Sequence, residues 1–256
     1  MKQRKKIVFI LLLSFLIFLF AEFQLRLYEK IRFHIPFLLS PSRYFDPLLG
    51  WNAKFITKQE LTKNYKIFIM GDSFTLGWGN PGVPEEKMYY NYLKTKLGAE
   101  IFICAGGGYA TLQEYLAMDK YIGQISPDLI ILQVCGNDFI NNSWQLESAS
   151  YLNNNLAIRP YLIDGKVVYR YPRFGGAYRV FLSAHSRLFY RFFMALEKVA
   201  ALFAKRHYFG IVSIEEIIAE KGIQLDEFKN SVAITQILLK RIKERARGGT
   251  HCSFYG

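Results

Sequence analysis

The sequence predicts an α/β fold around a parallel sheet, preceded by a helix that enters a membrane. Short apolar segments alternate with helix-like segments from residue 64 to residue 134, which is the pattern of strand, crossover helix and strand. A basic flank precedes a long apolar run at the N-terminus. Of the 256 residues, 51% are apolar and 16% are aromatic, so an intrinsically disordered protein is excluded.

The N-terminal segment, residues 1–25, is predicted to be an uncleaved signal anchor. Four cations within residues 2–6 precede the apolar run from Ile7 to Ala21, and no cleavage site of the A-x-A type follows this run. The run is shorter than the usual span of about 20 residues, so we expect Phe23 and Leu25 to extend the helix into the interface. A buried core helix is the alternative interpretation.

The charge of the basic flank predicts how the chain is oriented. Positive flanks stay in the cytoplasm, so the rest of the chain is expected on the extracytoplasmic side, that is, periplasmic or extracellular. Residues 26–62 are interpreted as a juxtamembrane linker that leads into the folded domain.

The elements of the sheet follow from apolar runs and helix-capping signals. Three strands and the two helices between them are predicted at residues 64–70, 84–98, 100–104, 111–123 and 129–134. Thr111 and Glu114 are interpreted as a capping box at the start of the second helix. Right-handed crossovers between parallel strands would bring the carboxyl ends of all three strands to one edge of the sheet.

The alternation stops after residue 150. A β-hairpin is predicted at Arg159–Ile163 and Lys166–Arg170, because Asp164-Gly165 is a strong two-residue turn signal. Three helices are expected to follow, at about 178–208, after the capping box of Ser213 and Glu216, and at about 226–247. The expected apolar face of the last helix consists of Phe228, Val232, Leu239 and Ile242.

Most of the net charge of +12 lies in one segment. Residues 165–208 contain nine cations and one acid, interleaved with aromatic residues. This composition suits a lid or interfacial helix that contacts anionic lipid headgroups or an acidic polysaccharide. A core-packing helix with a solvated charged face is the alternative. Nucleic acid is not predicted as a partner, because the segment shows no recognised binding motif.

The cysteines do not indicate a disulfide framework or a thiolate zinc site. Their number is odd and no C-x-x-C pair is present. Cys104, Cys135 and Cys252 are therefore interpreted as free thiols.

Three turns that follow the predicted strands carry residues that could take part in catalysis. Ser73 follows the first strand, three glycines at 106–108 follow the second, and Asn137 follows the third. Each has an ordinary structural explanation, since a serine can cap a helix, glycines can form a tight turn and an asparagine can bind loop backbone. Together they supply a hydroxyl, a backbone N–H and an amide, which are the parts of a nucleophile with an oxyanion hole.

These turns resemble the sequence blocks of the SGNH, or GDSL-like, hydrolases. The string at 71–79, Gly-Asp-Ser-Phe-Thr-Leu-Gly-Trp-Gly, is similar to the first block of that family, 108–111 to the second and 136–138 to the third. The upstream string at 46–51 and the anchor resemble membrane-tethered bacterial members. The likeness covers about residues 43–145.

The resemblance implies a fold and a chemistry. It implies a flavodoxin-like three-layer α/β/α domain over residues 63–256, with the hairpin and the basic aromatic helices as an insert at about 151–210. It implies ester hydrolysis or acyl transfer, with Ser73 as the nucleophile. The N–H groups of Ser73 and Gly108 and the amide of Asn137 would form the oxyanion hole. It implies no metal and no organic cofactor.

The catalytic base and its orienting acid are not identified. Members of the family carry Asp-x-x-His near the C-terminus, and no Asp in this chain is followed three residues later by His. The histidines are His34, His185, His207 and His251. We interpret the final helix, which no apolar strand follows, as the sign of a C-terminally shortened member of the family.

Two functions remain open from the sequence. The first is a serine esterase, deacylase or O-acyltransferase that acts on an envelope lipid or an acylated glycan. The second is a catalytically inactive, truncated and membrane-anchored protein that binds a glycan or a lipid.

Overall fold

The computed structural model places most of the chain. The residues that it describes are 2–33, 37, 46, 48–50, 54–55, 65–77, 85–150, 152, 158–170, 176–196, 199 and 213–247. The predicted shortening at the C-terminus concerns a part of the chain, 248–256, that lies outside the described residues.

The central sheet contains three parallel strands in the order β3-β2-β4. They are β2 (Lys66–Gly71), β3 (Glu100–Ala105) and β4 (Leu129–Leu132), which confirms the three predicted strands. A short strand, β1 (Lys54–Phe55), pairs antiparallel with β3. The first parallel strand in the chain is thus central, as in the flavodoxin-like order.

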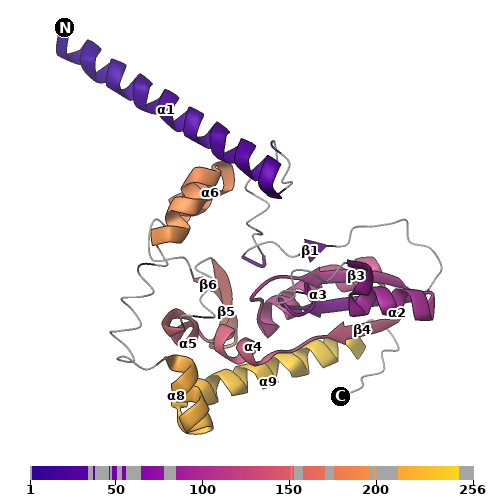
Figure 1. The fold of residues 1–256 in the computed structure, drawn as a ribbon. Helices are drawn as coiled ribbons and strands as arrows, with labels where there is room; N and C mark the ends of the chain where they lie inside the picture. Colours follow the sequence, from indigo (N-terminus) through magenta and orange to yellow (C-terminus); the bar gives the residue numbers. More distant parts are fainter. Residues whose placement is uncertain are drawn as a thin grey trace.

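Helices cover both faces of this sheet and produce three layers (Figure 1). On one face lies α2 (Tyr89–Leu97), which follows a 3₁₀ turn (Glu85–Lys87). On the other face, α3 (Thr111–Ile125) and α9 (Asp226–Arg247) pack against each other. The predicted α/β fold is confirmed.

The strands are buried on both faces because their side chains alternate between two clusters. Ile67 and Ile69 belong to the cluster with α2, whereas Phe68 and Met70 belong to the cluster with α3 and α9. Burial of this kind explains why β2 reads as a continuous apolar run in the sequence.

The start of α3 differs from the prediction. Its N-cap is Ala110, and the side chain of Gln113 accepts a hydrogen bond from the Ala110 N–H at 3.1 Å. The predicted capping box of Thr111 and Glu114 is wrong by one residue, because the helix begins at Thr111 itself. Glu114 therefore does not cap the helix. Its side chain is fully buried.

The buried face of α9 also differs from the prediction in part. Ile242 is buried as expected, but Leu239 is 37% exposed. The inner face consists of Ser231, Thr235, Leu238, Ile242 and Ala246. Leu238 packs against Leu112 of α3 and Leu162 of the hairpin, so α9 joins the sheet domain to the insert.

Two short helices, α4 (Gly136–Asn141) and α5 (Trp144–Ala149), follow β4. The predicted hairpin is confirmed as β5 (Arg159–Ile163) and β6 (Lys166–Arg170), with Asp164 and Gly165 at positive φ in the turn. The predicted capping box of Ser213 and Glu216 is also confirmed, and it begins α8 (Ile214–Lys221). A 3₁₀ turn (Gly222–Gln224) separates α8 from α9.

The single long helix predicted at 178–208 is wrong. The described part consists of α6 (Gly176–His185) and a second helical segment, 187–196, separated by Ser186. The Ser186 hydroxyl accepts a hydrogen bond from the Phe189 N–H at 3.2 Å. This N-cap begins a new helix and explains the break.

The N-terminal helix α1 (Lys2–Phe33) is long and apolar enough to cross a membrane. The apolar window within Gln3–Arg32 has a mean hydropathy of 2.5, and none of it is buried. Figure 1 shows α1 projecting from the domain, with α6 beside its C-terminal half.

We expect Leu238→Ala to lower the free energy of unfolding by about 2–5 kcal/mol, because it would leave a cavity between α3, α9 and the hairpin. The matched control is Leu239→Ala on the outer side of the same helix, which should cost less than about 1 kcal/mol. Chemical denaturation of the full chain in detergent, followed by near-ultraviolet circular dichroism, measures both. Equal losses would contradict the assignment of the buried face.

Candidate active site

The three turns predicted to form a site all leave the same edge of the sheet. Gly71 pairs with Ala105, and Met70 pairs with Leu132. Since the strands are parallel and in this register, their carboxyl ends lie level with one another. Ser73 follows β2, Gly108 follows β3 and Asn137 follows β4.

Hydrogen bonds join the turns to one another. The Gly106 N–H donates to the Gly71 carbonyl at 3.3 Å, which joins the turn after β3 to the turn after β2. The Gln133 side chain, just after β4, accepts from the Asp72 N–H at 3.3 Å and from the Thr75 hydroxyl at 3.1 Å. The turn after β2 is thus held from both sides.

The turn that carries Ser73 is compact and polar. The Asp72 carboxylate accepts from the Phe74 N–H at 2.9 Å, which closes an Asx-type turn. Ser73 is half-buried, and no described residue accepts a hydrogen bond from its backbone N–H. A Cβ at Gly71 would lie 2.2 Å from the Thr75 hydroxyl oxygen, so only glycine fits under this turn.

The turn that carries Gly108 is held by two side chains from outside it. Gly108 has φ +74°, a conformation that L-residues with a side chain rarely adopt. Its carbonyl accepts from Asn141 Nδ2 at 3.1 Å and from Arg159 Nη2 at 2.7 Å. The first donor comes from α4 and the second from the hairpin, so both neighbouring elements orient this turn.

Arg159 is a site-supporting residue that sequence reasoning missed. Its side chain is 1% exposed, and its Nε lies 2.8 Å from Glu147 Oε2. Its Nη1 donates to Gln113 Oε1 at 2.9 Å, and the Tyr161 hydroxyl donates to Glu147. A buried arginine with these contacts joins the hairpin, α3, α5 and the Gly108 turn.

Asn137 lies in the first turn of α4, and its side chain is half-buried. No described residue is hydrogen-bonded to this side chain. The helix itself is held by Asp138, whose carboxylate accepts from the Cys135 N–H at 3.1 Å. The amide of Asn137 is therefore available to a ligand at the sheet edge.

Three fully buried carboxyl groups lie behind these turns: Asp72, Glu114 and Asp138. Burial raises the pKa of Glu114 well above its usual value, and the nearby Asp138 and Asp72 raise it further. Burial also raises the pKa of Asp138 to about 7, against the lowering effect of its hydrogen bond from the Cys135 backbone. Among the described residues, no group of three or more His, Cys, Asp or Glu side chains is arranged to hold a metal ion.

The described residues do not include a base for Ser73. His185 lies at the end of α6, where its carbonyl accepts from Arg26 of α1. His34, His207 and His251 lie outside the described residues. Among the cysteines, Cys104 is a buried free thiol whose pKa is raised by burial, Cys135 is a half-buried free thiol, and Cys252 lies outside the described residues.

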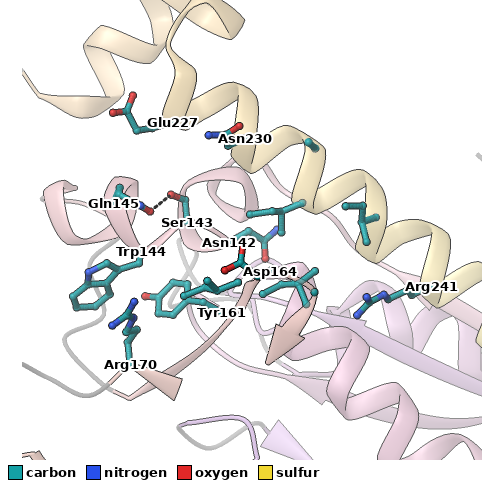
Figure 2. A pocket seen from close by; sticks show the side chains of 16 residues that line it. Asn142, Ser143, Trp144, Gln145, Tyr161, Asp164, Arg170, Glu227, Asn230 and Arg241 are labelled. Carbon is teal, nitrogen blue, oxygen red and sulfur yellow. Dashed lines mark hydrogen bonds between the residues drawn. The ribbon is translucent and has the colours of Figure 1, made fainter. Parts of the chain in front are cut away.

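A separate groove of about 560 Å³ lies between α5, the hairpin and α9. Figure 2 shows Trp144, Tyr161 and Arg170 along one side, with Asn230 and Arg241 of α9 along the other. The residues at the three turns do not line it. The groove is thus separate from the sheet edge.

Comparison with known proteins relates part of the chain to one protein family. The sequence model of one protein family, described as GDSL-like Lipase/Acylhydrolase, matches residues 67–163. The matched part begins in β2 and ends with β5, so it contains all three turns. No curated protein and no solved structure matches the chain.

We expect the stability of the protein to fall as the pH rises from about 4 to about 7. The pKa of Asp138 is raised from 3.8 to about 7 in the folded state, so the folded state holds a proton that the unfolded state has already lost. Asp138→Asn should reduce the change in the free energy of unfolding over this pH interval by up to about 4 kcal/mol, since one pKa unit corresponds to about 1.4 kcal/mol. Thermal unfolding at several pH values measures it.

The control for this prediction is Asp119→Asn. Asp119 is an exposed carboxylate on α3 that pairs with Arg245 at 2.7 Å, and Asp138→Asn should change the pH dependence by more than Asp119→Asn does. A wild-type stability that rises over the same interval would refute the buried, protonated state of Asp138.

Proposed function

We propose, from the premise that residues 67–163 form a GDSL-like lipase/acylhydrolase domain, that this protein is a membrane-anchored serine ester hydrolase or O-acyltransferase. The proposed substrate is an acyl ester on an envelope lipid or an acylated glycan. The observation that carries the proposal is the convergence of Ser73, Gly108 and Asn137 at one edge of a parallel sheet.

In the proposed reaction, Ser73 Oγ attacks the carbonyl carbon of the ester. The new C–O bond moves one electron pair onto the carbonyl oxygen, and a base takes the serine proton. Collapse of this intermediate expels the alcohol, which takes up that proton, and leaves an acyl-serine. Water then releases the acid in a hydrolase, or a second alcohol takes the acyl group in a transferase.

The negative oxygen of the intermediate would be bound by three donors. The Ser73 N–H has no acceptor among the described residues, and the Asn137 amide has no partner there. The N–H of Gly108 is the third proposed donor. Donors already in place before the reaction stabilise a developing charge without reorganisation, and loss of one commonly lowers the rate by roughly 10²–10³.

The membrane helix supports an envelope location. We propose that α1 is an uncleaved anchor with its basic N-terminus in the cytoplasm, so that the domain faces the periplasm or the extracellular space. The cations of the hairpin, Lys166 and Arg170, are proposed to contact anionic envelope surfaces. Lys166 and Arg170 of the hairpin are exposed and suited to this role.

The second candidate is a catalytically silent protein that binds a glycan or a lipid. It is favoured by two observations: no described residue supplies a base to Ser73, and the groove between the hairpin and α9 is large enough for a small ligand. Trp144 and Arg241, which line this groove, suit a sugar ring and an anionic substituent respectively.

The nucleophile is tested with a fluorophosphonate probe, which forms a bond to activated serines. We expect the full chain in detergent micelles to be labelled and Ser73→Ala not to be labelled. Ser148→Ala on α5 is the matched control and should be labelled like the wild type. Asn137→Ala should slow labelling by roughly 10²-fold if the amide binds the oxyanion. Equal labelling of wild type and Ser73→Ala would contradict the proposed serine enzyme and favour the proposal of a catalytically silent binding protein.

The orientation is tested by adding protease to intact spheroplasts. We expect the domain from residue 65 onward to be digested and a fragment containing α1 to remain with the membrane. A cytoplasmic protein should remain intact as a control for sealing. Complete protection of the domain would place it in the cytoplasm and contradict the proposed location.

A further inference from the structure

We infer that the helix at residues 187–196 lies flat at the outer membrane–water boundary, with its aromatic side in contact with lipid acyl chains. This inference rests on the proposal that α1 spans the membrane, and it does not depend on catalysis by Ser73. It assigns the lipid bilayer as the partner of this helix, and it also assigns which side of the helix meets the lipid.

The N-terminus of this helix abuts α1 end-on at Glu22. The Glu22 carboxylate accepts hydrogen bonds from the Ser186 hydroxyl at 2.8 Å and from the N–H groups of Arg187 and Leu188 at 3.0 and 2.9 Å. Arg26, one turn along α1, also binds Glu22 at 2.7 Å. A carboxylate from α1 thus caps the helix and attaches it at a defined height on the anchor.

The cationic side of the helix faces away from the membrane. Arg187 Nη1 lies 2.7 Å from Glu29 Oε2, and Arg191 Nη2 lies 2.6 Å from Glu29 Oε1. Glu29 follows Glu22 by seven residues, which is about 10 Å along a helix axis. These two arginines are therefore paired with the anchor on its outward side, so anionic headgroups are not their partner.

The opposite side of the helix faces the apolar part of the anchor. The rings of Phe18 and Phe189 are 5.2 Å apart, and Phe18 lies one turn, about 6 Å, deeper than Glu22. Phe193 stacks on Phe189 at 6.3 Å, and Phe192 contacts Phe193 at 5.6 Å. Phe192 is 54% exposed at the end of this aromatic row.

This arrangement has the geometry of an interfacial amphipathic helix. Such helices bury their apolar side about 5–10 Å into the boundary of headgroups and acyl chains. The depth given by the contact of Phe18 and Phe189 falls in this interval. The aromatic row continues the apolar surface of α1. We therefore assign lipid as the partner of the exposed Phe192 side chain.

The length of the anchor supports the same conclusion. The apolar run from Ile7 to Ala21 spans roughly 22 Å, whereas the hydrocarbon core is about 30 Å thick. Glu22 is therefore close to the acyl region, where an unsatisfied carboxylate would be costly. The donors at the start of the helix supply its hydrogen bonds and allow α1 to complete the span.

The test uses the photo-reactive residue p-benzoylphenylalanine in the full chain, reconstituted in vesicles of phosphatidylethanolamine and phosphatidylglycerol. The test variant replaces Phe192. The positive control replaces Phe15 in the apolar run, which is 57% exposed, and the negative control replaces Tyr92 on α2, which is 62% exposed. After irradiation, mass spectrometry measures the fraction of each protein that carries a covalently attached lipid.

We expect the yield of lipid crosslinks at Phe192 to approach that at Phe15 and to exceed that at Tyr92 by roughly tenfold. The reason is that a probe inserted among the acyl chains stays in contact with lipid, whereas a probe on α2 does not. A high yield at Phe15 with a Phe192 yield no greater than that of Tyr92 would overturn the inference and leave the anchor in place. A low yield at both Phe15 and Phe192 would overturn the anchor and the inference together. Crosslinks from Phe192 to a second copy of the chain, in place of lipid, would also overturn it.

Discussion

The register of three parallel strands is the constraint on which the candidate site depends. β2 lies between β3 and β4, and backbone pairing makes Gly71 level with Ala105 and Met70 level with Leu132. Three turns that are far apart in the chain then begin at one edge. Parallel pairing has this effect because all the carboxyl ends point the same way, and the crossover helices must return on the faces of the sheet.

The candidate site also requires that buried polar side chains hold the turns in place. Arg159 reaches the Gly108 carbonyl from the hairpin and is itself held by Glu147 and Gln113. On the other side, burial raises the pKa of the Glu114 and Asp138 carboxyl groups. The insert is thus part of the support of the candidate site, although the chemistry is assigned to the sheet edge.

The anchor and the insert are joined by charges in the same way. Glu22 and Glu29 of α1 are buried against Ser186, Arg187 and Arg191. Buried ion pairs of this kind contribute little net stability but impose a specific geometry. Here that geometry sets the orientation of the helix at 187–196 relative to α1, and with it the side on which the aromatic rings gather.

Elements whose signals are local could be predicted from the amino-acid sequence. The apolar runs of β2 to β4, the Asp164-Gly165 turn, the Ser213 capping box and the apolar α1 were all predicted, since each follows from a few adjacent residues. It also placed Ser73, Gly108 and Asn137 at strand ends. Other features needed the folded structure: the burial of Glu114 and Leu238, the role of Arg159, and the contact of Glu22 in α1 with the Arg187 and Leu188 N–H groups beside the break at Ser186. Each of these depends on partners distant in the chain, and a local pattern carries no information about which distant group will supply a hydrogen bond or exclude water.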